Sequence, residues 1–319
     1  MKKLLRMLAA ALAPLFLLSG CQAVASDTST LQSRKAVSSS PAVSQSSSLQ
    51  TATADKQNAS VWFFDVGQGD SELVRLPDGK NVLIDAGTAE SGSHLVKLLK
   101  GMNISKLDIV IATHPHADHI GGMQKVIQNF KIGSYYMPRI ANKDVPTSHL
   151  YTSLLKTIQK KKVSVSEAKA GITILKGSGE QIQLMAPLPV AHEGLNNYSA
   201  VAMVTIGQKK FLFTGDAEKE SENDMLKSKA DLHADVLKCG HHGSKTSTTT
   251  AFLKAVSPSA AIISCGRGND YGFPAMQTLS HLKNDNVKIY RTDEQKTICA
   301  HTDGKTITFE TGLTSATAS

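Results

Sequence analysis

The stretch THPHADHIGG, residues 113–122, places three histidines and one aspartate within six positions. The whole chain has only 11 histidines in 319 residues, so this crowding needs a chemical reason. Imidazole nitrogens and carboxylate oxygens are the groups that bind Zn²⁺, at about 2.0–2.2 Å. Just past a strand, His114 and His116 can turn toward one point while Asp118 and His119 face a neighbouring point. The spacing therefore fits two adjacent metal ions better than one.

Four side chains do not complete two metal sites, and two other stretches offer further ligands. FLFTGD, residues 211–216, ends an apolar segment with Asp216, and CGHHGS, residues 239–244, follows another with His241 and His242. Each feature alone has an ordinary explanation, since the aspartate also suits a helix cap and the histidine pair a polar loop. Three ligand groups, each at the end of an expected strand, favour a common site. Because a carboxylate between two cations is the usual bridge of two-metal hydrolases, we predict two divalent ions, Zn²⁺ or alternatively Mn²⁺.

The first 20 residues are typical of an export signal rather than of a fold. The basic start MKKLLR precedes an apolar run to Leu18, which is shorter than the about 20 residues that span a bilayer. The run ends in LSGC, which resembles the lipobox of bacterial lipoproteins, where the cysteine carries a lipid. We therefore predict a signal peptide over 1–20 and a lipid on Cys21, which would anchor the protein to the membrane outside the cytoplasm. An ordinary secretory peptide is the alternative.

Residues 21–59 form a second compositional block, with ten serines, four threonines and almost no large apolar side chain. Such a stretch cannot bury enough apolar surface to offset the entropy of ordering, so we predict a disordered tether. The remaining residues, 60–319, suit one α/β domain in length. The chain has a formal net charge of +8, of which +4 belongs to 60–319. This mild excess suits a polyanionic substrate without requiring one.

Periodicity and turn signals predict meandering strands followed by strand–helix alternation. The expected strands are 61–66, 71–76, 81–85, 107–113, 133–137, 181–185, 198–206, 210–214, 234–239, 260–265, 287–291, 296–301 and 306–310. The expected helices are 92–101, 121–130, 148–161, 217–228, 248–256 and 274–284. Ligand candidates at strand ends favour sheets sandwiched between helical layers. Cys239, Cys265 and Cys299 fall in expected strands, where buried unpaired thiols are preferred over a disulfide.

Seven motifs occur in the order that is seen in the metallo-β-lactamase superfamily: FFDVGQGDS, LIDAG, THPHADHIGG, NNYSAV, FLFTGD, ADVLKCGHHGS and ISCGRGNDYGFP. More narrowly, residues 61–295 resemble the extracellular hydrolase domain of the competence protein ComEC and its stand-alone relatives. The resemblance implies a four-layer αββα sandwich with two metal ions between the sheets. It also implies the ligands of each ion: His114 and His116 for the first, Asp118 and His119 for the second, and Asp216 as the bridge.

By the same resemblance, one of His241 and His242 completes the second ion's site, with His242 favoured and the other near the substrate. Where a third histidine usually serves the first ion, the chain reads NNYS, residues 196–199, so we expect that ion to bind more loosely. The competence-type group shares this feature. Phe273 stands where the group often has histidine, which puts the reaction rate or the substrate in doubt. The membrane channel of ComEC has no counterpart in this sequence, so we expect no DNA transport by this chain alone.

The implied ions would activate a water and offset negative charge that develops during reaction. Asp118, His241 and His242 are the catalytic candidates, with Asp118 orienting the water or taking a proton. Asp85 in LIDAG and Asp70 in VGQGDS are interpreted as partners that orient the ligands. The substrate-binding candidates are polar side chains near these motifs: Asn197, Ser199, Ser244, Lys245 and Thr246. The last three also lie where an N-cap for the expected helix 248–256 would be found.

These observations favour a lipid-anchored hydrolase of phosphodiesters that acts on DNA outside the cytoplasm. A second hypothesis keeps the ions and changes the substrate to phosphoesters of the cell envelope, because phosphorylcholine esterases resemble the same subgroup. The only tryptophan, Trp62, lies in an opening strand, which argues for the core rather than for a choline-binding cage. A third hypothesis is a non-catalytic lipoprotein that binds DNA or a partner protein. The incomplete first site disfavours a β-lactamase.

Overall fold

In the computed structural model, the described part of the chain runs from residue 58 to residue 313. The predicted signal peptide, the predicted lipid site Cys21 and nearly all of the predicted tether at 21–59 lie outside the described residues. The predicted domain at 60–319 is described except for its last six residues. Within the described range, no helix is both long enough and apolar enough to cross a bilayer.

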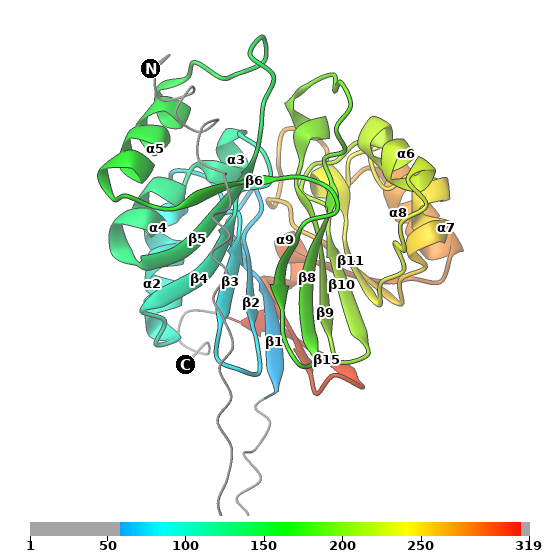
Figure 1. The fold of residues 1–319 in the computed structure, drawn as a ribbon. Coiled ribbons are helices and arrows are strands. Elements are labelled where there is room, and N and C mark those ends of the chain that lie inside the picture. Colours follow the sequence, from blue (N-terminus) through cyan, green and yellow to red (C-terminus); the bar gives the residue numbers. More distant parts are fainter. Residues whose placement is uncertain (1–57, 314–319) are drawn as a thin grey trace, which may run out of the picture. The chain divides into compact units, whose positions relative to one another are not determined.

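Two mixed β-sheets form the centre of the fold (Figure 1). The first sheet has eight strands, in the spatial order β15 (Ile307–Leu313), β14 (Thr297–Thr302), β1 (Ala59–Phe63), β2 (Glu72–Arg75), β3 (Asn81–Ile84), β4 (Lys106–Ile111), β5 (Lys131–Pro138) and β6 (Val165–Ala168). The second sheet has seven strands, in the order β13 (Lys288–Arg291), β12 (Ala260–Ile263), β11 (Val236–Lys238), β10 (Lys209–Phe213), β9 (Val201–Ile206), β8 (Glu180–Ala186) and β7 (Thr173–Lys176). Strands β3 to β6 and strands β10 to β13 run parallel, so the loops that leave them gather at one edge of each sheet.

Helices cover the outer face of each sheet (Figure 1). The helices over the first sheet are α2 (Gly92–Gly101), α4 (Met123–Asn129) and α5 (His149–Lys160). The helices over the second sheet are α6 (Lys219–Lys227), α7 (Thr250–Val256) and α8 (Met276–Asn284). Shorter turns lie in the connections: α3 (Ala117–Ile120), α9 (Thr292–Gln295), η1 (Leu195–Tyr198) and η2 (Gly240–Gly243). This order of layers confirms the predicted αββα sandwich.

Alternating side chains explain why the layers pack in this order. In β4, Ile109 and Ile111 belong to the apolar core between the sheets, whereas Val110 packs under the helices of the first layer. In β10, Phe211 belongs to the same central core as the isoleucines, and Leu212 packs under the helices of the other layer. Full burial of such a side chain contributes about 1.5–3 kcal/mol. The three apolar clusters therefore fix the strand ends at which the polar motifs begin.

All of the predicted elements are present, with ends within three residues of the predicted ones, and the differences have local causes. The strand predicted over 198–206 begins at Val201, because Leu195–Tyr198 form a 3₁₀ turn. Strands β6 and β7 were not predicted, since both are short and largely exposed and lie at sheet edges. The helix predicted from residue 248 begins after Thr249, whose side chain accepts from the backbone N–H of Phe252 as the N-cap.

The cysteines and the tryptophan are buried as predicted, but two of the cysteines lie outside the strands expected for them. Cys239, Cys265 and Cys299 are buried and unpaired, which confirms the preferred interpretation. Only Cys299 lies within a strand, because the other two follow the ends of β11 and β12. Trp62 is buried on β1, so its predicted place in the core is also confirmed.

Candidate metal centre

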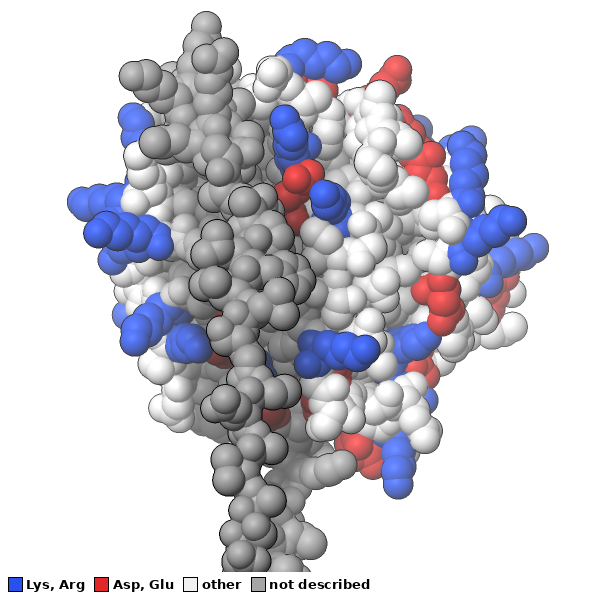
Figure 2. Space-filling model, viewed as in Figure 1, with Lys and Arg blue, Asp and Glu red and all other residues white. Residues whose placement is uncertain are grey.

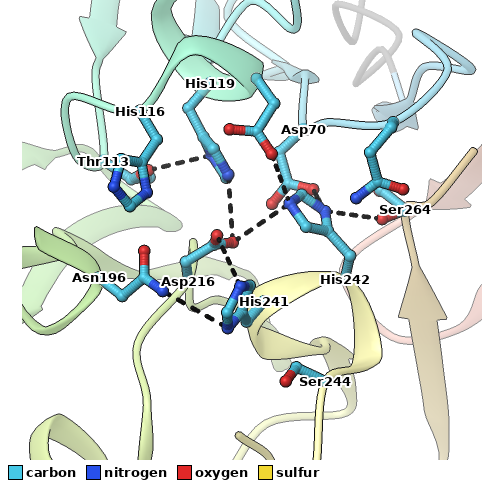
Figure 3. Close-up of polar contacts among 12 residues, drawn as sticks. Asp70, Thr113, His116, His119, Asn196, Asp216, His241, His242, Ser244 and Ser264 are labelled. Carbon is cyan, nitrogen blue, oxygen red and sulfur yellow. Dashed lines mark hydrogen bonds and ion pairs between the residues drawn. The ribbon is translucent and has the colours of Figure 1, made fainter. Parts of the chain in front are cut away.

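The polar motifs follow strand ends that meet at the same edge of the sandwich. The residues concerned are His114, His116, Asp118 and His119 after β4, Asp216 after β10, and His241 and His242 after β11. Figure 3 shows the side chains of His119, Asp216 and His242 pointing toward one another from these three connections. Segments more than 100 residues apart in the sequence therefore contribute to one polar centre.

The backbone of the histidine pair is left-handed at two consecutive positions. His241 has φ 49° and ψ 48°, and His242 has φ 55° and ψ 26°. A non-glycine residue in this region costs about 1–3 kcal/mol and persists only where its surroundings hold it there. The tight turn η2 allows both neighbouring imidazoles to face the centre, whereas an extended strand would direct them to opposite sides.

Gly69 allows the loop before β2 to approach the histidine motif closely. Its φ is +146°, and a Cβ atom at this position would lie 2.3 Å from the backbone oxygen of Asp118. The backbone N–H of Asp70 donates to the same oxygen at 3.1 Å. A side chain at residue 69 would force the two loops apart, so the glycine is what brings Asp70 to the centre.

Asp216 lies between two pairs of imidazoles. Its Oδ1 atom is 3.1 Å from His119 Nε2 and 3.6 Å from His242 Nε2. Its Oδ2 atom is 3.7 Å from His114 Nε2 and 3.8 Å from His241 Nε2. The two oxygens of one buried carboxylate thus face two different imidazole pairs, which is the arrangement that a bridging ligand requires.

Two clusters of candidate ligand atoms share this carboxylate. Within each cluster, one ligand atom of every residue lies within 4.8 Å of the others, and we name them the His119 cluster (Asp70, His119, Asp216, His242) and the His114 cluster (His114, His116, Asp216). Asp118 reaches the first cluster through its Oδ2 atom, which is 3.1 Å from His242 Nε2. His241 approaches Asp216 on the side of the second cluster. The structure therefore puts the two adjacent histidines on different sides of the carboxylate, with His242 beside His119 as favoured.

The buried ligand atoms of the His119 cluster are arranged so that a cation fits among them. Asp70 Oδ1, His119 Nε2 and Asp216 Oδ1 are buried and form no hydrogen bond of regular geometry among residues 58–313. Their near neighbours include one another and His242, with His119 Nε2 3.1 Å from Asp216 Oδ1 and Asp70 Oδ1 3.1 Å from His242 Nδ1. A divalent ion among them would bind all three atoms at once. Imidazole and carboxylate donors are those that Zn²⁺ takes, and they are also compatible with Mn²⁺.

The ligands of the His119 cluster are oriented by fixed partners. Asp85 Oδ2 lies 2.7 Å from His119 Nδ1, and the Thr113 hydroxyl donates to the same Asp85 oxygen at 2.6 Å. His242 Nδ1 donates to the backbone oxygen of Ser264 at 2.9 Å. Contacts of this kind hold the Nδ1 side of each ring and leave Nε2 directed at the centre. The geometry of Asp85 is that of the predicted orienting partner.

A second group of contacts supports His241. Glu218 Oε1 lies 3.1 Å from His241 Nδ1, and the Thr246 hydroxyl donates to the same Glu218 oxygen at 2.9 Å. Asn196 Nδ2 lies 3.5 Å from His241 Nδ1 (Figure 3). Glu218 was not singled out from the sequence, although it lies two residues after the predicted bridge. The contact directs Nε2 of His241 toward Asp216.

Two of the predicted substrate contacts have other tasks. Asn197 is buried, and its Oδ1 atom accepts from two backbone N–H groups at the start of α6, at 3.2 and 3.3 Å. Ser199 is also buried, and its Oγ atom accepts from the backbone N–H of Asp216 at 3.1 Å. Neither side chain is free to bind a substrate, so these two predictions are corrected. We expected a strand from residue 198 and missed the 3₁₀ turn at Leu195–Tyr198, which directs these side chains toward the backbone.

The remaining predicted substrate residues differ in exposure. Ser244 is buried, and its hydroxyl lies 3.0 Å from that of Thr246. Lys245 and Thr246 are exposed at the rim of the centre. A phosphate contact through Lys245 or Thr246 therefore stays a prediction, whereas Ser244 serves the turn itself.

A buried ion pair next to the centre was missed from the sequence. Lys238 Nζ lies 2.7 Å from Asp70 Oδ2, and both side chains are only 1% exposed. The other Asp70 oxygen lies 3.1 Å from His242 Nδ1. Lys238 therefore holds the carboxylate against the histidine. A lysine within the apolar strand segment ADVLKC was the signal that could have revealed it, since an unpaired lysine is almost never fully buried.

The charges of the centre are strongly coupled. Burial lowers the pKa of a histidine, but nearby carboxylates, above all Asp216, outweigh it and raise the pKa of His119 well above its usual value. The same balance raises the pKa of His242 to about 10. Burial would raise the pKa of Asp216, yet the facing imidazoles hold it well below the usual range. Burial and the charge of His119 keep the pKa of His114 well below its usual value, so this imidazole is neutral and able to bind a cation.

The αββα sandwich and the two ligand clusters at its edge can now be set beside known proteins. Residues 64–267 match the family model that is described as the metallo-β-lactamase superfamily. The chain belongs to this superfamily. The structure of CmlA, a diiron β-hydroxylase from Streptomyces venezuelae, is similar to this metallo-β-lactamase superfamily chain with a TM-score of 0.50 and 13% identity. The similarity covers 74% of this chain and 53% of that one and shows the fold alone.

Sequence relatives confirm the resemblance to competence proteins. ComE operon protein 3 of Bacillus subtilis is 32% identical over 251 residues, which cover 73% of this chain and 32% of that protein. Competence protein ComA of Neisseria gonorrhoeae is 28% identical over 240 residues, which cover 75% of this chain and 31% of that protein. This metallo-β-lactamase superfamily chain therefore matches about a third of the length of these relatives.

Proposed function

We propose that this chain is a dinuclear metal-dependent phosphodiesterase that cleaves nucleic acid, with DNA outside the cytoplasm as its substrate. The observation that carries the proposal is the position of Asp216, whose two oxygens face two different imidazole pairs. The proposal has two parts, a pair of ions and a nucleic-acid substrate. Each part has its own support and its own test.

In this proposal the two ions would share Asp216 and use separate imidazoles. The ligands of one ion would be His119, His242 and Asp118, with Asp70 beside them, and those of the other would be His114, His116 and His241. His241 would then take the part of the third histidine that the superfamily usually places near residues 196–199. Such ions supply Lewis acidity, and they lower the pKa of a bound water toward neutrality.

The chain's own residues would orient the reactants and move protons. Asp118 is the least buried carboxylate of the centre, and its side chain is 31% exposed. The facing imidazoles hold the pKa of Asp118 below its usual value, so it is ionised and can orient a water at the open side. Glu218 fixes the His241 ring, and Lys245 at the rim carries a positive charge that suits a phosphate.

A cavity that includes the end of η1 supports a polyanionic substrate. Its volume is about 290 Å³, and its lining includes Arg139, Lys143 and Tyr198. Tyr198 directly precedes Ser199, which bonds to the backbone of Asp216. Basic side chains beside a hydrolytic centre are where the phosphates that flank a cleaved bond would bind. On the face in Figure 2, Lys and Arg are otherwise interspersed with Asp and Glu rather than gathered in one large patch.

An aromatic pair at the rim supports a single-stranded substrate. The rings of Tyr271 and Phe273 stack at 5.5 Å with an interplanar angle of 14°, and Tyr271 is 69% exposed. The Phe273 ring lies 5.4 Å from the ring of His241. An exposed aromatic ring next to the centre can stack on an unpaired base, which contributes about 1–3 kcal/mol. In this proposal, Phe273 serves the substrate at the position where related chains often have histidine.

The same aromatic pair favours one alternative, a phosphorylcholine esterase of the cell envelope. A quaternary ammonium group binds over aromatic faces, and Tyr271 offers one beside the centre. The buried Trp62 cannot contribute to such a site. DNA remains the first substrate to test, because the cavity with Arg139 and Lys143 suits a substrate with several phosphates.

The proposed place of action rests on the sequence of the first residues. The basic start, the short apolar run and LSGC support export and a lipid on Cys21. Labelling with a radioactive or alkyne-tagged fatty acid should mark the full chain and should not mark Cys21→Ser. Equal labelling of both proteins would remove the anchor from the proposal.

The metal-dependent activity is tested with the purified chain on a single-stranded oligonucleotide. Chelator-treated protein should be inactive, and Zn²⁺ or Mn²⁺ should restore cleavage. Asp216→Asn keeps the size of the side chain and should lower the rate more than about 100-fold. Substitution of a residue that only hydrogen-bonds to a metal ligand already lowers metal affinity or activity about 10–100-fold. The matched control is Asp285→Asn at an exposed position, which should cleave like the original chain. Equal activity of both variants would remove Asp216 from the mechanism.

The substrate class is tested with matched substrates. Tyr271→Ala should raise KM for single-stranded DNA about 5-fold or more. Stacking of one base contributes about 1–3 kcal/mol to binding, and the lower value corresponds to about 5-fold. The same variant should leave an abasic strand of equal length unchanged, and Tyr271→Phe should behave like the original chain. Release of phosphocholine from wall material without DNA cleavage would replace the nucleic-acid proposal by the esterase alternative. Cleavage of nitrocefin alone would make the chain a β-lactamase.

A further inference from the structure

A third group of potential ligands lies outside the metal centre, between α6 and the segment that leads into η1. It consists of His192, Glu220 and Asp224, and one ligand atom of each lies within 4.8 Å of the others. Glu220 and Asp224 are four residues apart on α6, so their side chains emerge from the same face of the helix. His192 reaches this face from the preceding segment.

The hydrogen bonds of His192 leave one nitrogen without a partner. Nε2 lies 3.1 Å from the backbone oxygen of Leu188, which can only accept, so Nε2 carries a proton. Nδ1 is buried and has no hydrogen-bond partner among the described residues, and the residue as a whole is 4% exposed. Nδ1 faces Glu220 Oε1 at 3.5 Å. In the neutral ring, the lone pair of Nδ1 thus faces a carboxylate oxygen, and this repulsion is relieved either by a proton on Nδ1 or by a cation bound to both atoms.

The two carboxylates are held so that they can complete such a site. The backbone N–H of Glu193 donates to Glu220 Oε1 at 3.2 Å and keeps this side chain beside His192. Asp224 lies on α6 with 18% of its side chain exposed, and Lys227 approaches only its Oδ1 atom, at 3.7 Å and from solvent. An imidazole whose second nitrogen donates to a backbone carbonyl is the usual form of a metal-binding histidine.

We propose that His192, Glu220 and Asp224 bind a third divalent ion, a transition-metal cation such as Zn²⁺. One imidazole nitrogen and two carboxylate oxygens suit Zn²⁺ better than Mg²⁺ or Ca²⁺, which prefer oxygen ligands alone. The ion joins the segment before η1 to α6. It does not depend on the proposed hydrolase function, because no ligand is shared with the metal centre.

The location of this ion would let it position the segment that contains η1. The segment from His192 to Ser199 carries Asn196, which contacts His241, and Asn197, which accepts from the start of α6. Asn197 Nδ2 also lies 3.5 Å from Glu220 Oε2, so a proposed ligand of the third ion contacts the asparagine directly. Binding of the ion therefore fixes the wall of the metal centre that contains η1.

The test is a count of bound metal. The full chain is treated with chelator, dialysed against Zn²⁺, and its metal content is measured by mass spectrometry per mole of protein. His192→Gln and Asp224→Asn should each bind one equivalent less than the original chain. The matched control is His94→Gln, an exposed histidine on α2, which should bind as much as the original chain. Equal zinc content in the original chain, in Asp224→Asn and in His94→Gln would overturn the proposal.

A second measurement separates this site from the hydrolase proposal. Asp216→Asn should lose ions of the metal centre and keep the third ion. The double variant Asp216→Asn/Asp224→Asn should therefore bind one equivalent of zinc less than Asp216→Asn. If His192→Gln does not fold, Asp224→Asn decides alone, because Asp224 is partly exposed on a helix surface. A protonated Nδ1 of His192 in an NMR spectrum of the zinc-loaded protein would show an ordinary ion pair with Glu220, and this would also overturn the proposal.

Discussion

The buried pair of Lys238 and Asp70 allows a sharp prediction about stability. Lys238→Met keeps most of the length and apolar volume of the side chain and removes its charge. The variant leaves Asp70 fully buried, with the lysine that lay 2.7 Å from Oδ2 replaced by an apolar group. We expect the metal-free protein to lose stability through this unpaired carboxylate rather than through a cavity.

The expected loss is about 3 kcal/mol. Removal of one partner of a buried ion pair costs about 3–5 kcal/mol, because the other charge stays uncompensated. We take the lower end, because His242 Nδ1 remains 3.1 Å from Asp70 Oδ1 and can balance part of the charge. The double variant Lys238→Met/Asp70→Asn removes both charges and should recover at least half of the loss, since a buried pair is often worth little relative to neutral side chains.

The assay is urea unfolding in the presence of a chelator, followed by circular dichroism, for both single variants and the double variant. The chelator matters because Asp70 lies in the His119 cluster and a bound ion would compensate for the missing lysine. The matched control is Lys210→Met, which breaks a pair with Asp231 at 2.6 Å whose aspartate is 68% exposed. An exposed pair contributes about 0–1 kcal/mol, so this control should remain near the original stability.

Two results would refute the reasoning. A loss of less than about 1 kcal/mol for Lys238→Met would mean that the carboxylate is already balanced by other groups. A double variant as unstable as Lys238→Met would mean that the lysine acts through packing, because removing the second charge would then bring no recovery.

Three further predictions concern the same domain. Gly69→Ala would place a Cβ atom 2.3 Å from the Asp118 backbone oxygen. The matched control Gly67→Ala meets nothing within 4 Å, so it should lose only the about 1–2 kcal/mol that a left-handed backbone costs an alanine. Urea unfolding should therefore show a larger loss of stability for Gly69→Ala than for Gly67→Ala. The raised pKa of His242, about 10, means that its charged form stabilises the metal-free protein fully below pH about 6.5 and that this contribution is lost as the pH rises through 10. The melting temperature in chelator should therefore fall from pH 6.5 to pH 10, and a constant value would contradict the pKa. Thr249→Ala removes the N-cap of α7 and should cost about 1 kcal/mol, whereas Thr249→Ser should retain most of the stability in a thermal melt.

The fold and the meeting of the polar motifs at one edge of the sandwich could be predicted because their signals are local. The motif at residues 113–122 carries its ligand chemistry in six consecutive positions, and each predicted strand carries its apolar pattern within a short run of neighbouring residues. The central position of Asp216 between two imidazole pairs was expected from the chemistry that two cations require, and its role as a bridge stays a prediction. The strands β6 and β7 escaped prediction because each has only four residues, half of them exposed, and shows no apolar alternation.

The rest of the centre depends on contacts between distant segments. The sides taken by His241 and His242 follow from two consecutive left-handed residues, which no local propensity indicates. The pairing of Lys238 with Asp70 joins residues 168 positions apart. Asn197 was assigned to the substrate because its neighbours belong to a family motif, whereas its amide caps the start of α6. Burial and backbone geometry therefore decide the roles that residue type alone leaves open.

The direction of β1 has a practical consequence for handling the protein. Strand β1 runs from Ala59 toward the centre, so Ala59 and the loop with Asp70 lie at opposite ends of the first sheet (Figure 1). Five residues of extended strand span about 16 Å. A tag or dye that directly replaced the residues ahead of Ala59 would therefore begin at the end of β1 that is remote from the centre.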